Sequence, residues 1–376
     1  AGQSAGGGSV MSQMACMDNK GLFHRAVVMS AMIRSPYQVG GIGVPEELWH
    51  AEENGQHFLS FLGCSTIEQA RKLDAATIRD KYEEYTKIFP AMFTVLDHKF
   101  CVGDPMVLFM EGKHVNVPVM SGNTSDEFPS YIEASSKEDL KKKAEEIFGK
   151  NAETFLRFPE AMREDSDGKY AKVNGIECTI KCLFSDKKSA GEKKPYYYYR
   201  FDPDIPGWDN AGTFHSVDLW FFFETLAKCW RPFVGQHYDL SRMMCNYWVN
   251  FIKTGDPNGN DADGKPMPYW YPYEKEKPCE MIFMSDRPVV NCGWVTPFKE
   301  FLQEQIKKTL SIGKIFHKEW LEPIWEGEYC FRETFAAVAD ENGCRASFLW
   351  TPKEVLSVES YDGETVYEEG IDYLVE

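Results

Sequence analysis

The sequence predicts an α/β protein whose buried strands alternate with helices. Short apolar runs typical of buried strands recur along the chain, and stretches with apolar residues at helical spacing stand between them. Candidate polar residues follow several of these runs, and in parallel sheets functional groups gather beyond the carboxyl ends of the strands. With 376 residues, 43% of them hydrophobic, the chain has enough apolar material for one large domain or two unequal ones.

The first segment combines a serine flanked by small residues with a helix. The run from Gly2 to Gly6 reads Gly-Gln-Ser-Ala-Gly, and this Gly-x-Ser-x-Gly pattern lets a serine sit in a sharp strand-to-helix turn. The pattern is short, and glycine-serine runs also form linkers. Val10, Met14 and Met17 then follow at helical spacing, which a flexible linker does not predict.

Two further strands are expected to bring carboxylates toward one edge of the sheet. Residues 26–29 form a short apolar run, and residues 115–120 are rich in valine and stop at a Ser-Gly-Asn triplet. Asp126 and Glu127 then lie in the loop beyond the second strand, where functional groups collect. Either carboxylate alone would be interpreted as a solvated loop residue.

Residues 135–194 are rich in charge and predict an exposed helical region. Apolar residues from Leu140 onward recur at helical spacing, and Ser136 followed by Asp139 resembles a capping box in its weaker aspartate form. The lysine run 141–143 is explained as a solvated helix face with glutamates nearby. We assign it no function.

The next part of the chain supplies a candidate histidine. Residues 196–201 predict a strand and residues 203–212 a loop, and His215 stands at the end of that loop, before an aromatic helix or strand. Residues 243–254 are amphipathic and stop at Gly-Asp-Pro, which predicts a helix. A last helix over residues 296–310 closes this domain.

We expect two domains, an α/β domain over residues 1–311 and the start of a β-rich module over residues 312–376. The module carries a hairpin signal, because strand-type residues flank Asp362-Gly363, a dipeptide suited to a type I′ turn. The chain starts without methionine and the module breaks off at Glu376, so we expect a chain cut at both ends.

Charge and hydropathy limit the partners. The net charge of −17 disfavours nucleic acid and anionic membrane surfaces, since both call for basic patches. No apolar run approaches transmembrane length, so no membrane span is expected, and no signal peptide stands in the sequence. A signal could precede the first residue, which leaves the compartment open.

The cysteines predict neither a disulfide framework nor a metal site. Eleven is an odd number, and the spacing is irregular. A reducing, cytoplasmic interior is favoured, although a secreted protein with free thiols stays open. There is no Cys-x-x-Cys pair and no His-Glu-x-x-His, and Cys178 and Cys182 are interpreted as core thiols on one helical face.

Three polar residues stand in the order that a serine hydrolase requires. A serine hydroxyl is a poor nucleophile at neutral pH and needs a base to take its proton and a carboxylate to hold that base. The α/β-hydrolase arrangement supplies them in the order serine, acid, histidine. Ser4, Glu127 and His215 follow this order, each in a turn or loop after a strand-like run.

The sequence resembles the type B carboxylesterases, the family that also holds the cholinesterases and the bacterial esterases named for p-nitrobenzyl substrates. The matching stretches are "GQSAGGGSV", "KGLFHRAVVMS", "SGNTSDEF", "GTFHSVDLWFFFETL" and "NYWVNFIKTGDPNG". They cover the chain to about residue 305. The resemblance implies the C-terminal portion of an α/β-hydrolase fold with its first strands missing. The tail past residue 312 faintly resembles the front module of some SGNH-type hydrolases.

The resemblance also implies roles for individual residues. Ser4 matches the nucleophile, Glu127 the acid and His215 the general base, and the backbone N–H of Ala5 matches one oxyanion donor.

Two positions depart from patterns seen in the family. The family's acid is normally a glutamate followed by glycine, which favours Glu127 over Asp126, but Phe128 replaces that glycine here. Gln3 precedes the serine where cholinesterases carry glutamate, so a choline-type cationic substrate fits less well.

The implied reaction is two-step acyl transfer from a small-molecule ester, without a metal or organic cofactor. His215 would deprotonate Ser4, protonate the leaving alcohol and then activate water to release the acyl group. We expect the 376-residue chain itself to have little or no activity. The family's other oxyanion donors come from a glycine-rich upstream loop that this sequence lacks, and no strand is expected before Ser4.

The main alternative is a non-catalytic, cholinesterase-like interaction module. Such proteins usually lose the serine or the histidine, whereas all three candidates stand here. Among enzymes, a lipase or a thioesterase stays open. Nucleotide binding by the opening glycines is excluded, since neither Gly-x-Gly-x-x-Gly nor a P-loop lysine is present. The natural ester, the oligomeric state and the job of the tail stay open.

Overall fold

The computed structural model divides into two compact units, Ala1–Lys314 and Ile315–Glu376. In the first unit it describes residues 1–38, 44–186, 193–293 and 295–312. In the second it describes residues 338–340, 343–345, 358–359 and 366–367.

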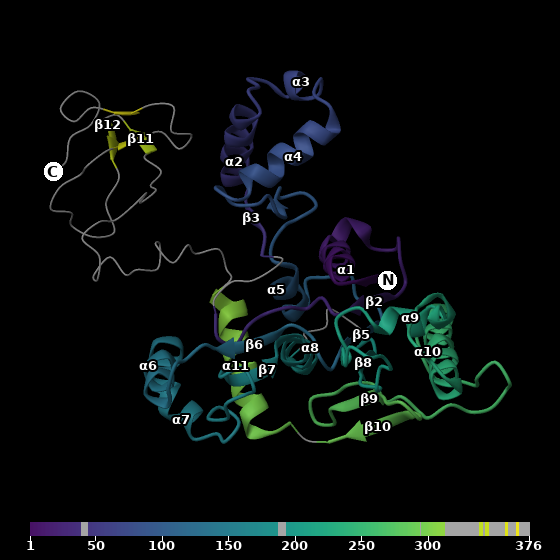
Figure 1. Ribbon diagram of the computed structural model, residues 1–376. Coiled ribbons are helices and arrows are strands. Elements are labelled where there is room, and N and C mark those ends of the chain that lie inside the picture. The colour runs from purple at the N-terminus through teal and green to yellow at the C-terminus, as the bar shows by residue number, and fades with distance from the viewer. Residues whose placement is uncertain are drawn as a thin grey trace. The chain divides into compact units, whose positions relative to one another are not determined.

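The described part of the first unit is built on a six-stranded sheet with the order β1-β2-β5-β8-β9-β10 (Figure 1). Neighbouring strands run parallel from β1 to β9, and β10 pairs antiparallel with β9. This confirms the predicted α/β class. The strands are β1 Gly2–Gln3, β2 Ala26–Met29, β5 Val119–Thr124, β8 Tyr196–Phe201, β9 Cys279–Phe283 and β10 Pro288–Cys292.

Helices pack on both faces of the sheet. One face is covered by α1 Ala5–Ala15, α5 Pro105–Met110, α8 Gly175–Asp186 and α11 Pro297–Ile312. The other is covered by α9 Asp218–Phe222 and α10 Gly235–Thr254.

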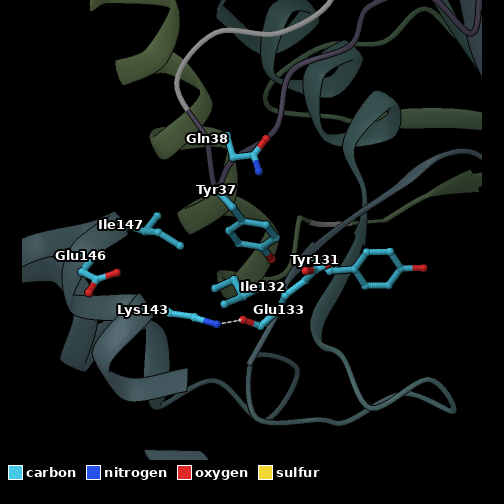
Figure 2. A pocket seen from close by; sticks show the side chains of 8 residues that line it. All are labelled: Tyr37, Gln38, Tyr131, Ile132, Glu133, Lys143, Glu146 and Ile147. Atoms are coloured by element: carbon cyan, nitrogen blue, oxygen red, sulfur yellow. Dashed lines mark hydrogen bonds between the residues drawn. The ribbon is translucent and has the colours of Figure 1, made fainter. Parts of the chain in front are cut away.

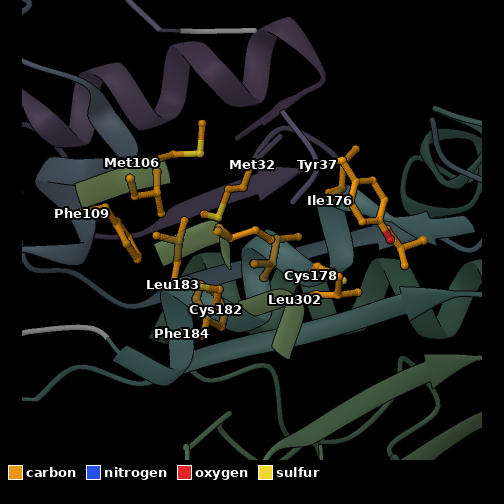
Figure 3. Packing of buried hydrophobic residues seen from close by; sticks show 14 of the residues in the cluster. Met32, Tyr37, Met106, Phe109, Ile176, Cys178, Cys182, Leu183, Phe184 and Leu302 are labelled. Carbon is orange, nitrogen blue, oxygen red and sulfur yellow. The ribbon is translucent and has the colours of Figure 1, made fainter. Parts of the chain in front are cut away.

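Alternation along the strands divides the core into two clusters. Val28 and Tyr198 belong to one cluster, and Val27 and Tyr199 to the other, as the two-residue period of a strand requires. Figure 3 shows part of the first cluster, where Leu302 of α11 is buried with side chains of α5 and α8. Because both faces are covered, the strands read as continuous apolar runs.

The remaining elements lie outside the central sheet. Between β2 and β5 come β3 Glu46–Glu47, α2 Leu48–Phe61, α3 Ile67–Ala70, α4 Ala75–Tyr85 and β4 Val95–Leu96. Between β5 and β8 come β6 Pro129–Ile132, α6 Lys137–Phe148, α7 Ala152–Leu156 and β7 Tyr170–Asn174. The 3-10 turns are Met17–Asn19, Gly149–Asn151 and Leu226–Lys228.

Several predicted elements are confirmed. The strands at 26–29 and 196–201 have the predicted bounds. The predicted helix at 243–254 begins earlier, at Gly235, and ends at Thr254, where Gly255 takes the left-handed conformation. The Ser136 hydroxyl accepts from the Asp139 N–H at 3.1 Å, so the predicted cap of α6 forms.

Two strand predictions near the candidate site are wrong. A strand does precede Ser4, since Gly2 and Gln3 pair in parallel with Val28 and Met29. The valine-rich strand does not stop at the Ser-Gly-Asn triplet but runs from Val119 through it to Thr124. Within the triplet, the Ser121 hydroxyl donates to the Val28 carbonyl at 2.7 Å, and the Asn123 Oδ1 accepts from the Tyr198 hydroxyl at 2.7 Å. The triplet therefore behaves as core.

One pair of cysteines departs from the expectation of unpaired thiols. Cys279 and Cys292 form a disulfide between β9 and β10, where they are register partners. Cys178 and Cys182 are buried core thiols on α8, as predicted. Burial raises the pKa of the Cys178 thiol to about 12, which keeps it protonated and unreactive.

The second unit contains two short antiparallel pairs in its described residues. β11 Val338–Asp340 pairs with β12 Gly343–Arg345, and β13 Val358–Glu359 pairs with β14 Val366–Tyr367. In the latter pair, Glu359 faces Val366, the register that a two-residue turn at 362–363 requires. The turn itself lies outside the described residues. The resemblance of this module to the front module of SGNH-type hydrolases stays a prediction.

None of the described helices combines the length and the apolar character that a membrane crossing requires.

A buried ionic network ties α8 to the sheet and to α11. The Lys181 ammonium lies 2.8 Å from both Glu177 and Glu280, and Glu177 also binds Lys299 at 2.6 Å. Burial alone would raise the pKa of Glu177, but the two ammonium groups outweigh it and hold the pKa at about 2. The charge of Lys181 thus stabilises the ionised forms of both Glu177 and Glu280.

We expect Lys181→Met to lower the free energy of unfolding by about 3–5 kcal/mol, because it leaves the buried Glu280 without its cation and Glu177 with Lys299 alone. Lys81→Met is the matched control: Lys81 binds Glu84 at 2.7 Å with both side chains about half exposed. That exposed pair contributes within about 1 kcal/mol. Urea denaturation of both variants measures the difference. Equal effects would contradict a structural role for the network.

Candidate active site

Ser4 stands in a strained turn between β1 and α1. Its φ is 55° and its ψ −123°, a conformation that residues other than glycine rarely adopt. The Ser4 N–H donates to the Met29 carbonyl at 2.9 Å, and its carbonyl accepts from the Gly8 N–H at 3.0 Å. The turn is therefore anchored to the sheet on one side and to the helix on the other. The geometry is that of a sharp strand-to-helix elbow.

The close approach in this elbow needs Gly2 and Gly7. A Cβ at Gly2 would lie 2.1 Å from the Gly6 carbonyl oxygen, and a Cβ at Gly7 would lie 2.4 Å from the Ala31 Cβ. A Cβ at Gly6, the last glycine of the sequence pattern, would meet nothing within 4 Å. The pattern therefore identified one of the two required glycines and missed the other.

Glu127 and His215 form a short, buried contact. The Nδ1 atom of His215 lies 2.6 Å from Oε2 of Glu127, whose side chain is completely buried. The other carboxylate oxygen accepts from the Thr124 N–H at 3.1 Å. Both oxygens of the carboxylate are thus held, and the histidine ring is oriented by one of them.

Asp126 holds the loop that carries His215. Its Oδ2 accepts from the Thr213 N–H at 2.8 Å and from the Thr213 hydroxyl at 3.0 Å. The two neighbouring carboxylates therefore bind different groups: Asp126 binds the loop at Thr213, and Glu127 binds the imidazole of His215. Sequence reasoning considered Asp126 only as a rival of Glu127, and the signal for this second role was the pair of adjacent acids itself.

His215 reaches the elbow at the residue before Ser4. The Gln3 side-chain nitrogen lies 3.2 Å from His215 Nε2, the nitrogen that faces away from Glu127. With the Nδ1 proton donated to Glu127, Nε2 accepts the Gln3 amide proton. No hydrogen bond joins the Ser4 hydroxyl to His215 within the described residues. A hydrogen bond from the Ser4 hydroxyl to Nε2 would have to replace that of the Gln3 amide. Hydrogen bonds in active sites often tighten only with substrate bound.

Phe128 does not prevent the acid–histidine contact. Its ring centroid lies 4.6 Å from that of His215, with the planes at 43°, and its side chain is exposed. Where the family pattern has glycine, this chain therefore covers one side of the imidazole with an aromatic ring.

Asp218 is a second buried carboxyl group near the acid–histidine pair. It begins α9, is fully buried, and accepts from the Tyr199 hydroxyl at 2.8 Å. Burial is the main reason that the pKa of Asp218 is raised to about 7; the charge of Glu127 adds to the rise, whereas the Tyr199 hydrogen bond and His215 oppose it. The protonated form keeps a second negative charge away from Glu127. The sequence contained no signal for this role.

Two cavities lie away from Ser4, Glu127 and His215. One of about 330 Å³ is lined by residues of α6 and β6 together with Tyr37 (Figure 2). Another of about 400 Å³ is lined by charged residues of α8 and β7, among others. Ser4, Glu127 and His215 line neither. Among the described residues, no group of three or more His, Cys, Asp or Glu could hold a metal ion.

Comparison with known proteins decides the family. The model of the carboxylesterase family matches residues 1–179 and 176–291. The chain belongs to the carboxylesterase family. Bile salt-activated lipase of Rattus norvegicus is 26% identical over 321 residues, which is 73% of this chain and 50% of that protein. Para-nitrobenzyl esterase of Bacillus subtilis (strain 168) is 25% identical over 316 residues, 77% of this chain and 59% of that protein.

The structural likeness agrees with the family. A solved structure of PNB esterase superposes with a TM-score of 0.57 at 21% identity, covering 82% of this chain and 61% of that one. The carboxylesterase resemblance and the α/β-hydrolase fold expected from the sequence are thus confirmed. The chain spans about half the length of the bile salt-activated lipase it matches.

We expect Asp218→Asn to flatten the pH dependence of stability in this carboxylesterase-family chain. Folded Asp218 keeps its proton up to about pH 7, whereas the unfolded group loses it near its ordinary pKa of 3.8. Between these values the folded state binds more protons, so the stability contributed by Asp218 falls as pH rises and is lost above the folded pKa. The asparagine retains an acceptor for Tyr199 without titrating.

Urea denaturation at about pH 5 and about pH 8 measures this effect. The wild type should lose on the order of 1 kcal/mol or more relative to the variant over that interval. Asp239→Asn, which changes an exposed carboxylate on α10, is the control and should follow the wild type. Parallel pH curves for wild type and Asp218→Asn would refute the assignment.

Proposed function

We propose that this chain carries the acyl-transfer site of a carboxylic ester hydrolase, with Ser4 as nucleophile, His215 as general base and Glu127 as the acid that orients the base. The observation that carries the proposal is the 2.6 Å contact from His215 Nδ1 to Glu127, with the opposite ring nitrogen next to the elbow. Family membership supports the proposal. The names of two relatives, bile salt-activated lipase and para-nitrobenzyl esterase, support it as well.

The proton pathway follows from the two nitrogens of the imidazole. Nδ1–H is held by the buried carboxylate, so Nε2 is the basic nitrogen that takes the proton of Ser4 as the hydroxyl attacks the ester carbonyl. The positive charge that develops on the ring is stabilised by Glu127, which is shielded from water. The same ring then protonates the leaving alcohol and activates water to hydrolyse the acyl-enzyme.

The start of α1 supplies the oxyanion donor. Ala5 is the first residue of the helix, and the first N–H groups of a helix have no intrahelical acceptor. The Ala5 N–H, adjacent to the nucleophile, is therefore available to the negative oxygen of a tetrahedral intermediate, with support from the helix dipole.

We also propose that the 376-residue chain turns substrate over slowly by itself. The resemblance assigns further oxyanion donors to a glycine-rich loop upstream of the nucleophile, and this sequence contains none. Loss of a single such donor costs roughly 10²–10³ in turnover. Acylation of Ser4 by a reactive probe is less demanding than turnover. Labelling therefore tests whether the nucleophile is present, and ester hydrolysis tests whether the chain is fully active.

We expect a fluorophosphonate probe to label the chain at Ser4. Ser4→Ala should abolish labelling, and His215→Gln should slow it by about 10²–10⁴-fold because the general base is lost. Ser9→Ala, an exposed serine on the same helix, is the control. Mass spectrometry locates the label, and hydrolysis of p-nitrophenyl acetate measures turnover.

The outcomes of this experiment separate the proposals. An unlabelled chain, or labelling that survives Ser4→Ala, would overturn the triad and favour the interaction module. Turnover in the ordinary esterase range of about 1–10³ s⁻¹ that disappears in Ser4→Ala would keep the triad and overturn the slow-turnover proposal.

We expect Gly2→Ala to abolish labelling while Gly6→Ala retains it. The added methyl group at Gly2 would collide with the backbone of α1, whereas the one at Gly6 meets open space. The two variants make the same chemical change four residues apart, so they test the elbow geometry directly. Circular dichroism shows whether each variant is folded. Equal labelling rates would contradict the required approach at Gly2.

A further inference from the structure

Two exposed tryptophans form a surface near the candidate active site. Trp208 is 88% exposed and Trp230 58% exposed. Their ring centroids lie 5.9 Å apart, and the ring planes are inclined by 38°. The rings therefore form a continuous but open surface, called here the tryptophan platform. Large aromatic side chains left in water, when they are grouped, mark interaction sites.

A buried arginine holds the platform in place. Arg231 is 7% exposed and binds both oxygens of Asp209, at 2.9 and 2.7 Å, and the Pro206 carbonyl at 3.1 Å. Its guanidinium lies over the Trp230 ring at 4.7 Å. Asp209 directly follows Trp208, so one rigid ionic contact fixes the backbone beside both rings.

The same arginine links the platform to the proposed general base. The guanidinium lies 5.4 Å from the Phe214 ring, and Phe214 directly precedes His215. The loop that carries Trp208 continues into Thr213, which Asp126 anchors. Trp208 and the imidazole therefore stand on one segment, residues 208–215, and Arg231 connects Trp230 to that segment through Asp209 and Phe214.

We propose that the tryptophan platform binds a neutral sugar ring, and that the ester processed at Ser4 is an ester of a carbohydrate. A sugar ring has an apolar C–H face and a rim of hydroxyls. The indole faces suit the first, and the Asp209 carboxylate beside them offers acceptor lone pairs to the second. The position of the ester bond rests on the proposed function, whereas sugar binding does not.

Other ligand classes fit this surface less well. A cation would meet the positive charge of Arg231 on the Trp230 face. An anionic saccharide would meet a chain with a net charge of −17. A fatty acyl chain calls for an enclosed apolar pocket, whereas Trp208 stands almost fully in solvent and neither of the two cavities above is lined by it.

Isothermal titration of the 376-residue chain with xylohexaose and with cellohexaose tests the binding site. Neither probe carries an ester, so catalysis is not needed. We expect binding of at least one, weakened about two- to tenfold by Trp208→Ala and by Trp230→Ala. Trp49→Ala, which removes a half-exposed tryptophan from α2, is the matched control and should bind like the wild type. Ser4→Ala should also bind like the wild type.

A protection assay connects the platform to Ser4. The bound oligosaccharide should slow fluorophosphonate labelling of the wild type and protect Trp208→Ala less. Absence of binding by both sugars, or equal binding by the wild type and the two platform variants, would overturn the proposal. Binding of tetraethylammonium that depends on Trp208 would overturn it in favour of a cation site. If the probe fails to label Ser4 but sugar binding still depends on the two tryptophans, the proposed esterase function is overturned and the proposed sugar-binding site is supported.

Discussion

The hydrogen bond between Glu127 and His215 depends on the parallel pairing of β5 with β8. Thr124 ends β5 and Phe201 ends β8, and these two residues are register partners, so the loops that follow leave the sheet at the same edge. A carboxylate buried at this edge is costly unless it is hydrogen-bonded. Glu127 obtains its partners from the Thr124 N–H and from the imidazole. The requirement to satisfy that charge therefore holds the histidine at the sheet.

Three carboxyl groups share this region, and each has different hydrogen-bond partners. Asp126 is tied to backbone and hydroxyl donors of Thr213, and Glu127 to an imidazole. Asp218 accepts from a phenol and forms no ion pair within the described residues, so burial favours its neutral form. Protonation of Asp218 avoids a second buried negative charge close to Glu127.

The segment from Trp208 to His215 joins surface recognition to the proposed chemistry. It is anchored by Arg231 near one end and by Asp126 and Glu127 near the other. Such double anchoring lets a loop present exposed rings without losing the position of a reacting side chain. The turn that carries Ser4 is also constrained, since Gly2 and Gly7 bring the backbone of α1 close to β1 and to the segment after β2.

The sequence by itself determined the α/β class, the family, most helix and strand positions near the site, and the three candidates Ser4, Glu127 and His215. The class and the elements follow from local periodicity, and the family and the three candidates follow from short motifs that resemble those of a known family. Both kinds of pattern depend on neighbouring residues. Only the tertiary structure decided that Gly2 and Gln3 form a strand, that the Ser-Gly-Asn triplet is buried, and that Cys279 meets Cys292. It also decided the roles of Asp126 and Asp218. Each of these depends on partners distant in sequence, and a local pattern carries no information about which distant group will satisfy a buried polar atom.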